Sequence, residues 1–201
     1  MTDAHDPLEL RLHTQGLPLP GMDIRVVDPG SGQPLSRGEA GEFRVKGYLT
    51  PGYYNDPELT RAAFDADGSF VTGDLGCLGD DGRVRFRGRL KEMIKTGGIN
   101  VAPLEVEGVL LTHPGVKQAY VVGVPDRDKG ERVVAAVELR EGATATAEAL
   151  AAFCRERLAS YKVPARIVFL KGDEFPRTPR GKVQKPQLRE ELARLVPSDA
   201  R

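Results

Sequence analysis

The pattern of the sequence changes near residue 88, and this change constrains the fold more than any other feature. Before it, short alternating or apolar runs are separated by turns rich in proline, glycine and aspartate, which is typical of antiparallel β structure. After it, helical patterns alternate with apolar strands. A glycine followed by charged residues at 88–92 is typical of a domain boundary. We therefore predict a β-rich part over residues 1–88 and a compact α+β domain over residues 89–201.

The secondary structure can be predicted in outline from the same patterns. In the first part, Asp56 and Pro57 provide an N-cap and an N1 proline for one short helix over 59–64. The second part is expected to contain further helices at its amphipathic or Ala-rich segments and strands at its apolar runs. The expected strands are 24–27, 42–47, 83–87, 119–124, 133–139 and 166–170, and the further helices are 103–111, 147–158 and 186–195.

Composition excludes several classes of partner. Twenty-nine basic and 29 acidic side chains balance, so we expect no general attraction to nucleic acid or anionic lipid. Cys77 and Cys154 lack the spacing of a disulfide framework or a structural zinc site, which favours a reducing, cytoplasmic setting. No apolar run approaches the roughly 20 residues of a membrane span, and no targeting signal is expected.

The first segment that could have a chemical role is Phe70-Val71-Thr72-Gly73-Asp74. We predict a strand end followed by a turn that presents one carboxylate beside a glycine. A carboxylate held in this way can accept hydrogen bonds from both hydroxyls of a ribose. The alternative is ordinary turn chemistry, since Thr-Gly-Asp is common in turns.

The second segment, GRLKEMIKTGGIN at 88–100, places Arg89 and Lys91 at the predicted boundary and follows them with Gly97 and Gly98. Paired glycines accept positive φ values and allow a ligand close to the backbone. A lysine at a boundary can exchange partners when one domain turns on the other. The alternative is a solvated linker followed by a tight hairpin.

The third segment, PRTPRGKVQK at 176–185, is a loop broken by proline and glycine that presents Lys182 before the last predicted helix. A lysine on such a loop can bring a compact positive charge to an anionic centre. The alternative is a basic tail that only aids solubility.

These three segments, in this order and at these separations, resemble the adenylate-forming superfamily of acyl-CoA synthetases, aryl-CoA ligases, luciferase and peptide-synthetase adenylation domains. The resemblance covers nearly the whole chain. Further matching segments are GYYNDPELT at 52–60, VE at 106–107, HPGV at 113–116, VGVPD at 122–126 and YKVP at 161–164. It implies the end of the large domain's β-barrel subdomain, followed by the small mobile α+β C-terminal domain.

The resemblance also implies a role for each candidate residue. Asp74 and Arg89 are expected to bind ATP and AMP, and Lys91 is expected to be the hinge of the mobile domain. Lys182 is expected to be catalytic during adenylation. Gly97 and Gly98 are expected to line the path of coenzyme A.

The activity implied by the resemblance has two steps. A carboxylic acid and ATP with Mg²⁺ first form an acyl-adenylate, and coenzyme A then forms the thioester. We expect no bound prosthetic group and assign no metal ligands or roles for the isolated histidines within the chain. Which acid is activated cannot be read from the sequence, although acyl-CoA ligases are often part of fatty acid metabolism.

The superfamily's phosphate loop and most of its acyl pocket belong to an N-terminal adenylation region that is not recognisable here. The segment from Pro29 to Gly32 lacks a following lysine and is better explained as a hairpin turn. We therefore expect that the chain needs this region, in the same chain or as a separate subunit, and is inactive alone. The competing hypothesis is a non-catalytic module that binds a partner or a nucleotide without turnover. Within the enzyme class, we prefer a CoA ligase to the two other types. A peptide-synthetase adenylation domain would usually be followed by a carrier domain, which is not seen here, and nothing in the sequence supports the oxygen chemistry of luciferase.

Overall fold

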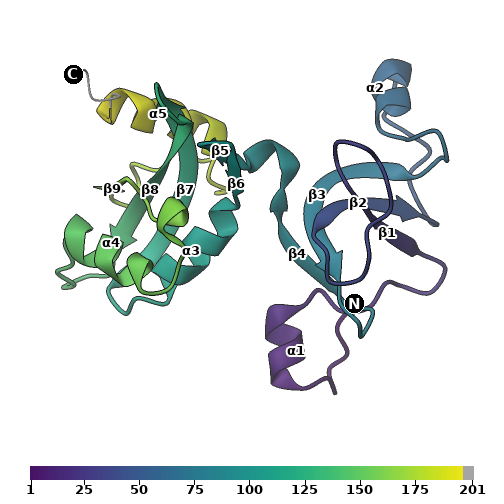
Figure 1. Cartoon of the computed structure of the whole chain (residues 1–201), viewed down its shortest axis with the longest axis horizontal. Helices are drawn as coiled ribbons and strands as arrows, with labels where there is room; N and C mark the ends of the chain where they lie inside the picture. Colours follow the sequence, from purple (N-terminus) through teal and green to yellow (C-terminus); the bar gives the residue numbers. More distant parts are fainter. Residues whose placement is uncertain (197–201) are drawn as a thin grey trace. The chain divides into compact units, whose positions relative to one another are not determined.

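A computed structural model of the chain describes residues 1–196 (Figure 1). The chain divides into two compact units, Met1–Lys91 and Glu92–Arg201, and each is described by itself. The first unit ends at Lys91, shortly after the boundary expected at residue 88. The assignment of the units to the domains of a larger enzyme stays a prediction.

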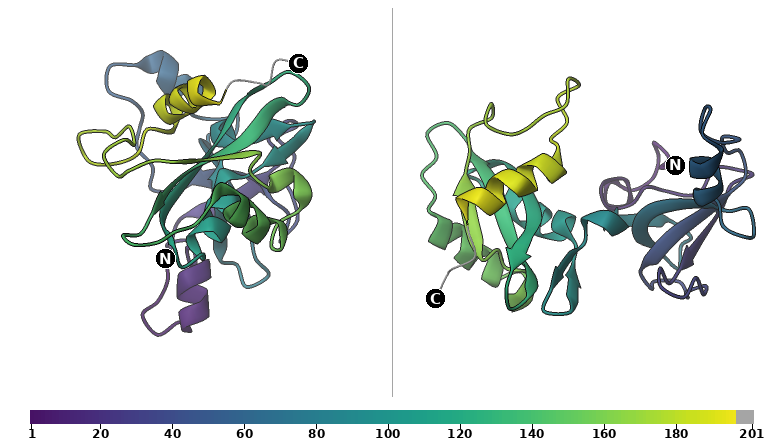
Figure 2. Two further views of the ribbon diagram at one scale, coloured as in Figure 1. Left: turned by 90° about the vertical axis from the view of Figure 1, so that its left-hand side faces the viewer. Right: turned by 90° about the horizontal axis from the view of Figure 1, so that it is seen from above.

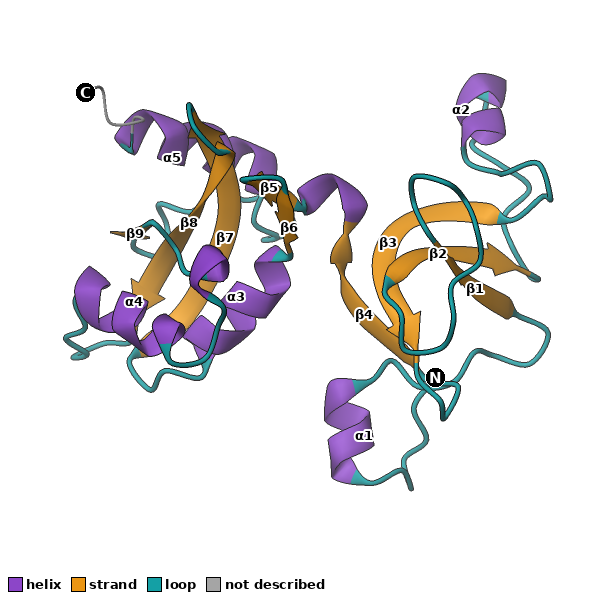
Figure 3. Ribbon diagram, in the orientation of Figure 1, coloured by secondary structure: helices purple, strands orange, loops and turns teal. Residues whose placement is uncertain are grey.

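The first unit is built around an antiparallel sheet with the order β1-β2-β3-β4 (Figure 3). Its strands are β1 (Asp23–Val27), β2 (Gly41–Lys46), β3 (Phe70–Leu78) and β4 (Val84–Arg89). The short helix α2 (Pro57–Ala62) joins β2 to β3 and lies two residues earlier than the predicted range 59–64. The expected cap is present, because the Asp56 side chain accepts a hydrogen bond of 2.8 Å from the Leu59 amide.

Helix α1 (Leu8–His13) was not expected from the sequence. It has no buried residue, and Leu8 and Leu12 are 61% and 67% exposed, so burial does not specify this helix. Its leucines stand at positions 8, 10 and 12, a spacing that indicates a strand as readily as a helix.

The core of the first unit is small. Its buried apolar side chains among the described residues are Val26, Val27, Phe43, Ala63 and Cys77. Large apolar side chains remain at the surface, including those of Tyr48 and Tyr54, which are 84% and 99% exposed.

The second unit has a five-stranded sheet with the order β6-β5-β8-β7, in which β9 pairs in parallel with β8 and the other pairs are antiparallel. Its strands are β5 (Ile94–Thr96), β6 (Ile99–Val101), β7 (Val116–Asp126), β8 (Gly130–Leu139) and β9 (Arg166–Phe169). Strands β7 and β8 form a long hairpin in the middle of the unit.

Helices cover both faces of this sheet. Helices α3 (Pro103–Leu111) and α4 (Ala147–Arg155) lie on one face and α5 (Lys185–Leu195) on the other, as Figure 2 shows. Side chains alternate along β8: Val133, Ala135 and Val137 pack with α3 and α4, whereas Val134 and Ala136 pack with α5. Burial on both faces explains why this strand is an uninterrupted apolar run.

The predicted α+β fold class is confirmed, and most predicted elements are present. Helix α3 has the expected bounds, whereas α4 ends at Arg155 rather than at 158. Two short 3₁₀ helices, η1 (Leu90–Glu92) and η2 (Ser160–Lys162), were not predicted. Among the residues described, no helix combines the length and apolarity needed to cross a membrane.

Candidate nucleotide and catalytic site

The Thr72-Gly73-Asp74 segment is a bulge inside β3, which corrects the prediction of a turn after a strand end. The pairing between β2 and β3 passes from Arg44↔Val71 to Glu42↔Leu75, so three residues of β3 lie opposite one residue of β2. Gly73 has φ of +69°, in the left-handed region that favours glycine. The strand then continues to Leu78, and the bulge turns the segment without ending it.

Polar contacts hold the bulge in place. The Thr72 hydroxyl donates to the Phe43 carbonyl at 2.9 Å and accepts from the Asp74 amide at 3.0 Å. The Gly73 amide donates to Glu42 Oε1 at 3.1 Å. Glu42 is only 3% exposed, and its other oxygen lies 2.8 Å from Arg44 Nη1. Sequence reasoning missed this buried pair, for which the only signal was a glutamate within an apolar strand.

Asp74 and Arg89 are brought together by the β3–β4 ladder. They are register partners, and Arg89 Nε lies 3.1 Å from Asp74 Oδ1. Asp74 Oδ1 is buried and makes this ion contact without a well-aligned hydrogen bond. The two side chains are 31% and 48% exposed, so both can still reach a polar ligand.

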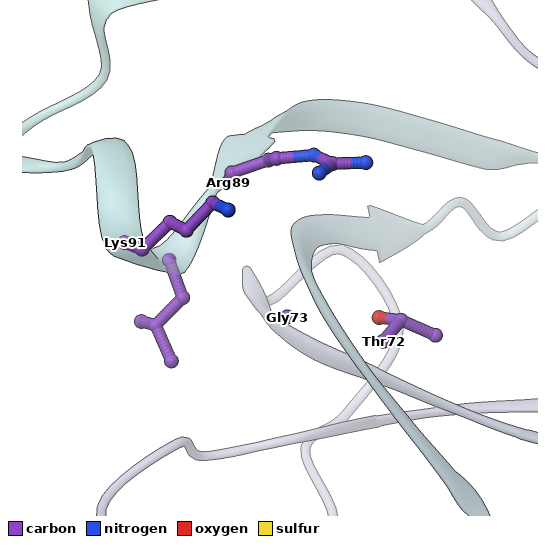
Figure 4. Close-up of a pocket in the computed structure, with 5 residues that line it drawn as sticks. Thr72, Gly73, Arg89 and Lys91 are labelled. Atoms are coloured by element: carbon purple, nitrogen blue, oxygen red, sulfur yellow. The ribbon is translucent and has the colours of Figure 1, made fainter. Parts of the chain in front are cut away.

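A pocket of about 380 Å³ lies beside this pair, and its lining residues are Thr72, Gly73, Arg89, Leu90 and Lys91. Figure 4 shows that Arg89 and Lys91 extend from β4 and η1, with Thr72 and Gly73 on the neighbouring strand. Lys91 is exposed, and its ammonium group makes no ion pair within the described part of the chain. The pocket is therefore lined by two cationic side chains of the first unit, and one of them, Arg89, is in ion contact with the Asp74 carboxylate.

Gly97 and Gly98 form the two-residue loop of the β5–β6 hairpin, in which Thr96 pairs with Ile99. Their φ values are +57° and +79°, as expected for a tight hairpin of the type I′ class. A Cβ atom on either glycine would meet open space. Backbone conformation, rather than crowding within the chain, therefore accounts for the two glycines.

The Lys182 loop is a compact turn. The Thr178 amide donates to the Lys182 carbonyl at 2.8 Å, and Arg177 Nη1 donates to the Gly181 carbonyl at 2.8 Å. Val183 is buried and fixes the loop to the α5 side of the sheet. Lys182 itself is exposed, and its ammonium group makes no ion pair with any described residue. The loop is therefore ordered while its lysine stays available.

The candidate residues fall into two groups. Asp74, Arg89 and Lys91 belong to the first unit, whereas Gly97, Gly98 and Lys182 belong to the second. Within the described residues, no cluster of three or more histidine, cysteine, aspartate or glutamate side chains could hold a metal ion.

Comparisons with known proteins show which class of proteins this chain resembles. Residues 105–182 match the AMP-binding enzyme C-terminal domain. The chain is 45% identical over 188 residues to 2-succinylbenzoate–CoA ligase of Geobacillus kaustophilus, covering 93% of this chain and 36% of that protein. It is 43% identical over 184 residues to sulfoacetate–CoA ligase of Cupriavidus necator, covering 91% of this chain and 35% of that protein.

Solved structures agree with these relatives. ATP-bound MatB from Rhodopseudomonas palustris superposes with a TM-score of 0.85 at 40% identity, over 91% of this chain and 36% of that chain. The Bacillus subtilis o-succinylbenzoate-CoA synthetase in complex with its acyl-adenylate gives 0.81 at 35% identity, over 96% of this chain and 37% of that chain. The chain therefore matches the C-terminal part of the adenylate-forming superfamily. It spans about a third of the length of the curated relatives it matches.

Proposed function

We propose that this chain is the C-terminal part of an AMP-forming carboxylate–CoA ligase. The observation that supports this most is the Asp74–Arg89 pair, held on neighbouring strands beside the Gly73 bulge and the pocket. A carboxylate next to a guanidinium suits the ribose of a nucleotide, because Asp74 would accept hydrogen bonds from the hydroxyls while the contact with Arg89 orients that carboxylate. ATP with Mg²⁺ and coenzyme A are substrates in this proposal.

The first half-reaction joins the acid to AMP. An oxygen of the carboxylate substrate attacks the α-phosphorus of ATP, the bond to the β-phosphate bridging oxygen breaks, and pyrophosphate leaves. Negative charge builds up between the two anions as they approach. Lys182 would offset that charge from its exposed position on an ordered loop.

The second half-reaction transfers the acyl group to the thiol. The thiolate of coenzyme A attacks the acyl carbon, the bond to the phosphate oxygen breaks, and AMP leaves. Gly97 and Gly98 would line the path of the thiol arm, since their tight turn carries no side chain that would obstruct it.

Lys91 would be the hinge between the two half-reactions. It lies in η1 at the end of the first unit, where the compact units divide. A domain rotation would then serve both steps.

An N-terminal adenylation region would supply the rest of the site. The relatives are about three times as long as this chain, and the first unit has a small core with tyrosines exposed at its surface. That region would bind the phosphates, Mg²⁺ and the acyl group of the substrate. A cytoplasmic location and a place in fatty acid metabolism stay predictions from the sequence.

A chimera tests this proposal directly. The C-terminal 36% of the Geobacillus ligase would be replaced by this chain, and the product supplied with 2-succinylbenzoate, Mg·ATP and coenzyme A. One solved neighbour is itself a chimera of two proteins. We expect release of pyrophosphate and formation of the thioester by the chimera, and neither by its two parts assayed separately.

Two outcomes separate the hypotheses. A folded chimera that neither adenylates nor forms the thioester, while the parental ligase does both, would support the non-catalytic module instead. Activity of the N-terminal part alone, equal to that of the chimera, would also contradict a catalytic role for this chain.

A further inference from the structure

The Glu131 carboxylate connects the glycine hairpin to α5. Its Oε2 atom accepts a hydrogen bond of 2.8 Å from the Lys95 amide in β5, and its Oε1 atom lies 2.6 Å from Arg189 Nη2 in α5. Glu131 is 22% exposed at its side chain, so both contacts are partly shielded from water. One side chain therefore joins two elements that are far apart in the sequence.

The hairpin has few other attachments to the sheet. In the described structure, the β5–β8 register consists of the pair Thr96↔Gly130, and the Gly97 amide adds a bond of 2.9 Å to the Lys129 carbonyl. The register partners Ile94 and Val101 are buried in the core and anchor the base of the hairpin. The bond from Lys95 to Glu131 takes the place of a further ladder bond, so its loss would loosen the hairpin toward its tip.

Arg189, which binds Glu131, is itself fixed by its own contacts. Its Nε atom donates to the Gly123 carbonyl at 2.7 Å. The neighbouring Leu188, which also belongs to α5, is fully buried against the sheet. Lys185 fixes the start of the same helix, with its ammonium group 2.9 Å from Glu107 Oε1. Helix α5 therefore links the base of the Lys182 loop to the glycine hairpin.

Gly123 leaves the room that Glu131 needs. A Cβ atom at this position would lie 2.8 Å from Glu131 Oε2 and 2.9 Å from Ile94 Cγ2. The φ of Gly123 is not in the positive range, so the backbone would accept alanine there. The absence of a side chain at this position is explained by the carboxylate that fills the space.

We propose that Glu131 and Arg189 are positioning residues for the Gly97–Gly98 hairpin and set the efficiency of thioester formation. They act on the substrate only through the hairpin. This inference rests on the proposed function, because it assigns the hairpin to the second half-reaction. The adenylation step is assigned to Asp74, Arg89 and Lys182. No described hydrogen bond or ion pair joins Glu131 or Arg189 to these three residues, so adenylation should be insensitive to the pair.

The first test compares half-reactions in the chimera. Glu131→Gln keeps the shape of the side chain but replaces one acceptor oxygen with a donor, so one of the two contacts is lost. We expect thioester formation from supplied acyl-adenylate to fall about tenfold or more, with a raised KM for coenzyme A. Pyrophosphate release in the first half-reaction should stay within about twofold of the parent.

Matched variants make the comparison specific. Arg189→Ala should produce the same selective loss, and the double variant should be no worse than the stronger single variant, because the two residues act as a unit. Glu105→Gln is the control: it removes an ion pair of 2.6 Å with Lys162 in the same unit but touches neither the hairpin nor α5. Both half-reactions should survive that change.

A structural measurement on this chain is independent of catalysis. Hydrogen exchange followed by NMR should show faster exchange of the Lys95 amide in Glu131→Gln and in Gly123→Ala, with unchanged protection of the Val134 amide in the centre of β8. Unchanged Lys95 exchange would overturn the geometric part of the inference.

The kinetic outcomes are equally decisive. An equal loss of rate in both half-reactions would show that Glu131 has only a structural role. An unchanged rate in both would show that Glu131 does not affect the hairpin's function. Both results are distinguishable from failure of the proposed function, in which the unmodified chimera itself would be inactive.

Discussion

Asp74 on β3 and Arg89 on β4 are direct register partners, with Arg89 Nε 3.1 Å from Asp74 Oδ1. The ladder between the strands fixes their backbones, while the Gly73 bulge next to Asp74 changes the direction of the chain. A partly exposed ion pair contributes only about 0–1 kcal/mol to stability. Its position beside a pocket therefore indicates binding more than it indicates structural support.

The first prediction concerns this pair. In the chimera, Asp74→Asn is expected to raise the KM for ATP about tenfold or more, because an amide offers one acceptor where the carboxylate offers two. Arg89→Ala should act in the same direction, and the double variant should show less than the product of the two effects. Steady-state kinetics at varied ATP would measure this. Asp80→Asn, at an exposed acidic residue in the same unit, is the control, and an equal effect there would contradict the assignment.

The second prediction concerns Lys182. Lys182→Ala should lower the rate of adenylation about 100-fold, since it removes a preorganised positive charge. Thioester formation from supplied acyl-adenylate should be largely retained. Pyrophosphate release and thioester formation would be assayed separately, with Lys171→Ala as the control at an exposed lysine. Equal loss of both half-reactions would refute the assignment of Lys182 to the first step.

The third prediction concerns the hinge. Lys91→Pro fixes φ at this position and should therefore trap one pose of the mobile domain. We expect adenylation to persist while thioester formation falls about tenfold or more. Lys91→Ala leaves φ free and removes only the charge. It therefore separates the effect of the lost charge from the effect of the fixed φ angle. Full transfer to coenzyme A by the proline variant would rule out a hinge at Lys91.

The fourth prediction concerns the glycine hairpin. Gly97 has φ of +57°, so Gly97→Ala should destabilise the second unit by about 1–2 kcal/mol, the cost of a left-handed conformation for a residue with a Cβ atom. Gly97→Asn should cost less, because asparagine tolerates this region. Urea unfolding of both variants would measure the difference. Equal stabilities of the alanine variant and the parent would contradict the backbone explanation.

The fifth prediction concerns pH. Burial raises the pKa of the Cys154 thiol above its ordinary value, with a smaller opposing effect from Arg157 and Arg155. A raised pKa in the folded state means that this contribution to stability is complete below the unfolded pKa of about 8.5 and is lost as the pH rises toward the folded pKa. The parent should therefore lose more stability than Cys154→Ala between pH 7 and about pH 9.5.

Urea midpoints across this range would measure the fifth prediction. Cys154→Ala also leaves a small cavity, so its stability is expected to be lower at every pH, and the slope with pH is the informative quantity. Identical slopes for the two proteins would show that the thiol does not titrate differently in the folded state.

Local patterns determined much of the secondary structure. The proline at N1 set the start of α3, the Asp56 cap set the start of α2, and the apolar run at 133–137 marked the central strand. The glycine pair left two explanations open, close approach of a ligand or a tight hairpin, and the positive φ values at Gly97 and Gly98 agree with the hairpin. The motifs also named Asp74, Arg89 and Lys182 by their order along the chain.

The supporting contacts depended on the tertiary structure. Glu42 holds the Gly73 bulge, and Glu131 joins the hairpin to α5, yet each is an ordinary glutamate in the sequence. Their partners come from other strands and helices, so no local spacing could identify them. Periodicity and turn residues therefore determined most of the elements and the fold class, and the order of the motifs identified the candidate residues. Only the packing of strands and helices decided which carboxylate reaches which backbone amide, because such contacts depend on distances between segments that are remote in the chain.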